Sequence, residues 1–154
     1  MIDQKKTEKL LIKEFKIVNE EPFPSLGISV GLKQNNYFHW EITMFGPDDT
    51  YYAGGIFKLT IEFKVEHPLL IPKVKFETKI YHCNVSEEGD INIPCLKNWN
   101  ENISISEVLS DIFSLFYIQT PDFDFNKEAS EVYESNINSF IKKAKLFTQN
   151  FASS

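Results

Sequence analysis

The residue types best suited to chemistry are gathered between residues 81 and 95. This stretch begins with Tyr81-His82-Cys83-Asn84 and continues through Gly89-Asp90-Ile91-Asn92 to Cys95. A cysteine thiolate is a strong nucleophile, and an imidazole can act as a general base near neutral pH. If the chain has a catalytic centre, its candidates therefore lie here.

The same residues do not predict a metal or a cofactor. Zinc sites place cysteines and histidines at characteristic spacings, and His82 beside Cys83 is a poor start for such a site. The serines, histidines and aspartates show no hydrolase motif. Two cysteines are too few for a disulfide framework, although a single bridge between Cys83 and Cys95 stays open. We therefore expect no cofactor and no metal.

Composition narrows the class of protein. The 154 residues carry a net charge of -6, and all sixteen basic residues are lysine. Nucleic-acid binding usually brings a basic surplus, so we expect no nucleic-acid partner. No run of about 18 apolar residues predicts a membrane span, and the N-terminus lacks the apolar core of a signal peptide. We expect a protein of the cytoplasm or another reducing intracellular compartment.

Local patterns predict the elements that must position the chemical stretch. Residues 7–19 have the apolar periodicity of an amphipathic helix, with lysines on the other face. Ser104-Ile105-Ser106-Glu107 is a capping box that begins a second helix. Residues 127–151 are also helical, with a break near 135–136. Four strand candidates lie between the first two helices, at residues 27–33, 37–45, 56–63 and 74–78.

Consecutive strands without an intervening helix indicate an antiparallel meander. Residues 81–102 show no regular pattern, but anchors such as Ile91, Leu96 and Trp99 indicate an ordered loop. We therefore predict a single α+β domain over residues 1–154. Its order is an N-terminal helix, a four-stranded antiparallel meander, an ordered loop, and two or three C-terminal helices.

This order resembles that of the ubiquitin-conjugating enzymes, over about residues 9–152. Ile80-Tyr81-His82-Cys83-Asn84 is similar to the family's Tyr-His-Pro-Asn signature. The other segments that match in order and spacing are Phe38-His39-Trp40, Gly46-Pro47, residues 52–57, residues 67–76, Gly89-Asp90-Ile91, Trp99 and residues 147–152. The resemblance implies the fold of that family.

In that family a cysteine accepts ubiquitin, or a relative of it, as a thioester and passes it to a lysine. This cysteine lies eight residues after the signature asparagine, a position that Asn92 occupies here. A carboxamide is no nucleophile of comparable strength. We therefore interpret His82, Asn84 and Asn92 as a degenerate site with no catalytic residue. Asn84 is expected to keep a structural role, and His82 to pack the loop rather than act as a base.

A further departure concerns the acid beside the active site. Phe123 stands where the resemblance implies an acidic residue in many members, so help in deprotonating an incoming lysine is in doubt. Asp122 precedes it and could substitute in part.

The resemblance also indicates partner surfaces. Leu69 occupies a position that is often aromatic, and Glu101-Asn102 replace the usual Pro-Ala after the tryptophan. A charge in that apolar patch is expected to weaken docking of RING ligases. The basic first helix that docks the activating enzyme in the family is resembled here by Lys5, Lys6, Lys9 and Lys13. A solvated helical face would explain these four lysines equally well.

Two functions compete. The leading hypothesis is a non-catalytic protein-binding or structural module, with ubiquitin or a ubiquitin-like protein, a conjugating enzyme, or subunits of a larger assembly as partners. The rival is an active conjugating enzyme that uses Cys95 as a fallback nucleophile. Cys95 lies three residues after Asn92, which is about 10 Å in an extended strand. The rival therefore requires a rebuilt loop, which Pro94 could mark.

Overall fold

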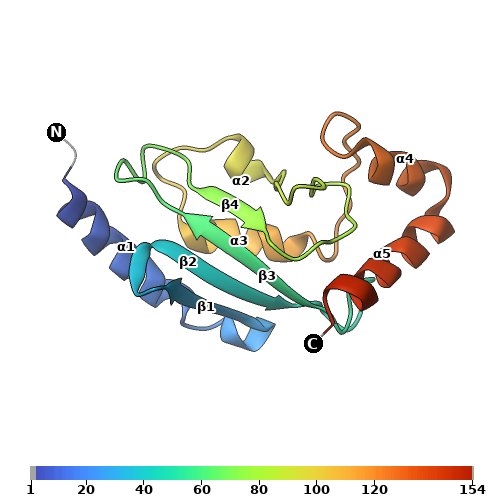
Figure 1. The fold of residues 1–154 in the computed structure, drawn as a ribbon. Helices are drawn as coiled ribbons and strands as arrows, with labels where there is room; N and C mark the ends of the chain where they lie inside the picture. Colours follow the sequence, from blue (N-terminus) through green and yellow to red (C-terminus); the bar gives the residue numbers. More distant parts are fainter. Residues whose placement is uncertain (1–2, 154) are drawn as a thin grey trace.

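The computed structural model describes residues 3–153 and confirms the predicted order of helices and strands (Figure 1). Residues 1, 2 and 154 of the predicted domain lie outside the described residues. In chain order the elements are α1 (Gln4–Val18), the 3₁₀ turn η1 (Pro24–Leu26), β1 (Ile28–Lys33), β2 (Asn36–Phe45), β3 (Ile56–Glu62), β4 (Lys73–Phe76), α2 (Pro94–Lys97), α3 (Ile105–Ser114), α4 (Lys127–Ser135) and α5 (Ile137–Phe151).

The four strands form one antiparallel sheet in the order β1-β2-β3-β4, as the meander predicts. Val30, Ile42 and Leu59 lie opposite one another in register and are all buried. Figure 1 shows α3 behind the sheet, and its apolar face joins the core of buried side chains that the sheet contributes to. The sheet therefore supports the loop that follows β4.

Helix α1 begins at Gln4, three residues earlier than predicted. Asp3 caps it, because its side chain accepts a hydrogen bond from the Lys5 N–H at 3.0 Å. Further along α1, the Glu14 carboxylate contacts His67 Nε2 at 2.9 Å and accepts a hydrogen bond from the Ile105 N–H at 3.2 Å. One side chain therefore ties α1 to the turn before β4 and to the start of α3.

The ordered loop contains a one-turn helix, α2, that the sequence did not predict. Pro94 occupies its first turn, where a missing N–H costs nothing. Four residues are too few to show a helical periodicity, which explains the omission. Before α2, isolated antiparallel bridges join Val85 to His82 and to Ile91, so this loop is held by backbone pairing.

The predicted break in the last helical stretch falls at Asn136, which ends α4 and caps α5. The end of α5 returns to the sheet, where the Ile56 N–H donates to the Ala152 carbonyl at 2.7 Å. Figure 1 shows α4 and α5 at the opposite end of the sheet from α1. None of the helices described within residues 3–153 is both long and apolar enough to cross a membrane.

Candidate functional site

Asn92 lies in a groove between the ordered loop, the end of α3 and the segment that follows it. The groove has a volume of about 520 Å³, and the side chains of Asn84, Ile118 and Asp122 share its lining with Asn92. Both the backbone and the side chain of Asn92 are hydrogen-bonded. Its N–H donates to the Asn84 carbonyl at 2.9 Å, and its Nδ2 donates to Asp122 Oδ2 at 3.0 Å. A shallower depression of about 450 Å³ continues past Asn92 and Asp122 on their other side.

Gly89 sets the path of the chain into this groove. Its φ of +94° lies in the left-handed region, and a Cβ there would lie 2.1 Å from the Phe76 carbonyl oxygen. Only glycine tolerates both conditions. The Phe76 N–H in turn donates to the Gly89 carbonyl at 2.9 Å. The edge of the sheet therefore anchors the segment that delivers Asn92.

Asn84 is buried and fully engaged with Thr120. Its Oδ1 accepts a hydrogen bond from the Thr120 N–H at 3.0 Å, and its Nδ2 donates to the Thr120 carbonyl at 2.8 Å. This pair joins the ordered loop to the segment after α3. The Asn84 side chain therefore has a structural role, since it links the backbones of these two segments.

His82 is buried, and both of its ring nitrogens have partners. Nε2 donates to the Leu115 carbonyl at 2.6 Å, and Nδ1 accepts from the Asn84 N–H at 2.9 Å. A carbonyl can only accept and an N–H can only donate, so these partners select the neutral tautomer with hydrogen on Nε2. Burial lowers the pKa of His82 to about 4. At neutral pH the ring has no free nitrogen with which to take a proton.

Both cysteines are free thiols. Cys83 is fully buried, and burial raises its pKa to about 11. Cys95 lies in α2 and packs against the core. Burial, reinforced by the nearby Asp111 carboxylate, raises the pKa of Cys95 to about 12. In the described residues, its side chain is absent from the lining of the Asn92 groove.

Asp122, rather than Phe123, is the residue that meets Asn92. Asp122 Oδ1 accepts hydrogen bonds from the Asp124 and Phe125 N–H groups at 3.0 and 3.2 Å. This local turn directs the Asp122 carboxylate toward Asn92, while Phe123 is exposed. The sequence analysis left Asp122 open as a partial substitute for the missing acid, and the structure places its carboxylate, rather than the Phe123 ring, beside Asn92.

The predicted partner residues lie on the surface. Leu69 is 59% exposed, and Glu101 and Asn102 are exposed as well. Trp99 brings the two loops together, because its Nε1 donates to the Pro68 carbonyl at 3.0 Å. The opposite face of α1 is buried, and its solvent side carries the exposed Lys5, Lys6, Lys9 and Lys13.

No group of three or more histidine, cysteine, aspartate or glutamate side chains within residues 3–153 is arranged to hold a metal ion. The groove is lined by the amides of Asn84 and Asn92 and the carboxylates of Asp111 and Asp122. In a comparison with protein families, the model of the ubiquitin-conjugating enzyme family matches residues 10–148, which is most of the chain.

Proposed function

The chain belongs to the ubiquitin-conjugating enzyme family, and we propose that it is a non-catalytic member. In this proposal it serves as a protein-binding or structural module, within a larger complex or within a ubiquitin or ubiquitin-like pathway. Its partners are a ubiquitin-like protein, a conjugating enzyme or the subunits of an assembly.

The observation that carries the proposal is the environment of Asn92. Its carboxamide donates to Asp122 at 3.0 Å in the groove that also holds Asn84. Thioester formation requires a thiolate that attacks and later leaves, and a carboxamide supplies neither property. A hydrogen bond to a carboxylate gives the carboxamide a structural use in place of a catalytic one.

The environment of Cys95 argues against a displaced nucleophile. Its thiol packs against the core beside Asp111, and a pKa of about 12 leaves almost no thiolate at neutral pH. Within the described residues Cys95 does not line the Asn92 groove, so its thiol would have to be repositioned to act there. The surfaces of Leu69, Glu101 and the α1 lysines remain exposed for binding without chemistry.

A thioester assay tests the proposal directly. The protein is incubated with activating enzyme, ubiquitin and ATP, and the products are separated with and without reductant. We expect no adduct that reductant removes, under conditions where an active conjugating enzyme is loaded in a parallel reaction. An adduct on the unmodified protein that disappears in Cys95→Ala would overturn the proposal and establish the active enzyme.

A further inference from the structure

The charges around the shallower depression beside Asn92 are separated by sign. The depression has a volume of about 450 Å³. The charged residues that line it are Lys73, Lys97, Asp90, Asp122 and Asp124. The two lysines come from β4 and α2, whereas the aspartates come from the loop after Gly89 and from the segment before α4. That segment lies to the right of α2 and β4 in Figure 1. The depression therefore has a basic side and an acidic side.

Most of these charges are free to meet a partner. The charged residues that are exposed and form no ion pair with residues 3–153 are Lys73, Lys97, Asp90 and Asp124. The Asp122 carboxylate, by contrast, already accepts hydrogen bonds from Asn92 and from its own turn. Two positive and two negative charges are therefore available on one surface.

Apolar side chains accompany the charges on both sides of the depression. Leu70 and Ile71 are 44% and 46% exposed, and together with Leu69 they form a run of three exposed apolar residues before β4. Ile71 lines the depression on its basic side, and Phe125 lines it on its acidic side. Phe123, in the same turn as Phe125, is exposed as well. Clustered exposed apolar residues rimmed by charges are typical of a protein–protein contact.

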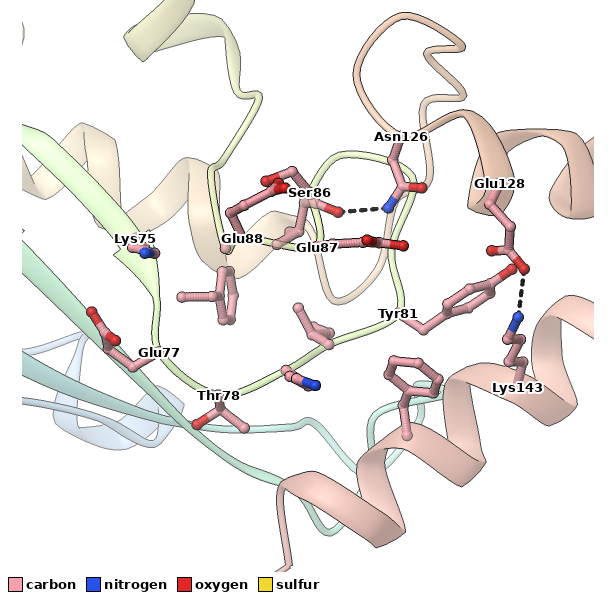
Figure 2. A pocket seen from close by; sticks show the side chains of 16 residues that line it. Lys75, Glu77, Thr78, Tyr81, Ser86, Glu87, Glu88, Asn126, Glu128 and Lys143 are labelled. Carbon is pink, nitrogen blue, oxygen red and sulfur yellow. Dashed lines mark hydrogen bonds and ion pairs between the residues drawn. The ribbon is translucent and has the colours of Figure 1, made fainter.

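A larger pocket, of about 790 Å³, shows no such separation of charge (Figure 2). It lies between the segment after β4 and the helices α4 and α5. Lysine and glutamate alternate along one wall, at Lys75, Glu77 and Lys79. At one end Glu128 is paired with Lys143. The rim of this pocket favours neither sign of charge, so the separated charges beside Asn92 are the stronger indication of a partner.

The two-sided pattern discriminates between partners. A partner surface of a single sign would be attracted by one side of the depression and repelled by the other. A second copy of the chain avoids this conflict when a two-fold axis runs along the depression between its two sides. Such an axis lays the basic side of each copy on the acidic side of the other, so that every contact occurs twice. The surface is therefore complementary to itself.

We infer that this depression is the interface of a symmetric dimer of the chain. Lys73 and Lys97 of each copy face the acidic side of the other, where Asp90 and Asp124 lie. Ile71 of each copy packs toward the turn that carries the two phenylalanines of the other. The inference goes beyond the proposed function and does not depend on it, because these contacts involve no thioester chemistry.

Sedimentation equilibrium with a charge exchange tests the inference. The unmodified chain should show a reversible monomer–dimer equilibrium with a dissociation constant in the micromolar range. Two variants reverse the two sides separately: Lys73→Glu with Lys97→Glu, and Asp90→Lys with Asp124→Lys. Each variant alone should dimerise at least about tenfold more weakly, because like charges then face each other. An equimolar mixture of the two should dimerise at least as tightly as the unmodified chain, because opposite charges face each other again.

Matched controls separate this interface from general effects of charge and apolar surface. Lys142→Glu with Lys145→Glu makes the same change in net charge on exposed residues of α5, and should leave the dimer unchanged. Ile71→Ser should weaken the dimer at least about tenfold, whereas Ile12→Ser, at a similarly exposed position on α1, should not.

A monomer at concentrations up to about 1 mM would overturn the inference. So would a dimer that either charge reversal leaves intact, a mixture of the two variants that stays monomeric, or equal effects of the two serine substitutions. Circular dichroism of each variant checks that the fold is kept, as expected for substitutions at exposed residues.

Discussion

Asp122 is the residue that both holds Asn92 and shapes the turn after α3. One carboxylate oxygen accepts the Asn92 amide, and the other accepts the backbone N–H groups of Asp124 and Phe125. The Asn92 side chain therefore faces a carboxylate at hydrogen-bonding distance. This arrangement suits a carboxamide donor better than it suits a thiolate.

The first prediction concerns a thiol placed in that position. A carboxylate neighbour disfavours ionisation of a thiol, so the new thiol in Asn92→Cys should be alkylated slowly at pH 7.5. Adding Asp122→Asn keeps an oxygen for the two backbone donors and removes the charge. It should raise the rate about three- to tenfold, which corresponds to a pKa lower by about half a unit to one unit.

Site-resolved mass spectrometry after timed iodoacetamide labelling measures this rate apart from those of the native cysteines. Asp124→Asn is the matched control, because it removes a nearby exposed charge, whereas the Asn92 side chain donates its hydrogen bond to Asp122. Equal acceleration by both asparagine substitutions would show that Asp122 exerts no specific influence.

His82 gives a prediction about pH. Its pKa falls from an ordinary 6.5 to about 4 in the folded chain because of burial. Between pH 6.5 and about pH 4, His82 therefore binds a proton in the unfolded chain but not in the folded chain. The stability linked to His82 is complete above pH 6.5 and is lost as the pH falls toward 4, by up to about 3 kcal/mol.

Urea unfolding at pH 7 and pH 4.5 measures the loss. His82→Gln removes the titration and keeps a donor for the Leu115 carbonyl, so the gap in stability between it and the unmodified chain should narrow at pH 4.5. Imidazole NMR signals of His82 that titrate with a midpoint near 6.5 would contradict the prediction.

At the scale of elements, two asparagines cap the two C-terminal helices in different ways. Asn136 Oδ1 accepts the Ser139 N–H at 3.1 Å, and this cap is its contribution to α5. Asn126 caps α4 through Ala129, and its Nδ2 also donates to the carbonyls of His82 and Val85. The Asn126 side chain therefore joins α4 to the ordered loop, whereas the Asn136 side chain caps α5 through Ser139.

Substitution by aspartate separates these roles, because it keeps the capping oxygen and removes the amide donors. Asn136→Asp should leave stability within about 0.5 kcal/mol, or raise it slightly through the helix dipole. Asn126→Asp should lower stability by about 1–3 kcal/mol, because two loop carbonyls lose their donor and face a charge. Thermal and urea unfolding measure both values. Equal costs at the two positions would mean that the bonds to the loop contribute nothing.

At the scale of the whole molecule, surfaces form from residues distant in sequence. Trp99 holds the loop that carries Glu101 and Asn102 against the turn that carries Leu69. Leu69 on one of these segments and Glu101 on the other are both exposed. An apolar ligase surface would have to desolvate the Glu101 carboxylate to dock here, so we predict weak binding of an ordinary RING domain.

Restoring the family's apolar residues should therefore recover docking. The triple substitution Leu69→Phe, Glu101→Pro and Asn102→Ala is expected to raise the affinity for a generic RING domain at least about tenfold. Calorimetric titration of both proteins measures the change. Leu69→Phe alone is the matched control, and it should recover less because the charge remains. Micromolar binding by the unmodified protein would contradict the prediction.

The sequence by itself determined the elements of this protein, because their signals are local. The apolar period of α1, the alternation in the strands, the Ser104 cap and the break at residue 136 each depend on residues a few positions apart. The spacing from Asn84 also assigned Asn92 to the nucleophile position, and that assignment remains an inference from resemblance. The one-turn α2 was missed because four residues carry no period.

The tertiary structure decided the neighbours of each side chain. Asp122 meets Asn92 across thirty residues, and the partners of His82 and Asn84 come from the end of α3 and the segment after it. The groove beside Asn92 exists only once the ordered loop, the end of α3 and the segment after it have packed together. Hydrogen-bond partners, tautomers and exposure depend on which distant segments meet, and no local pattern of residues records that.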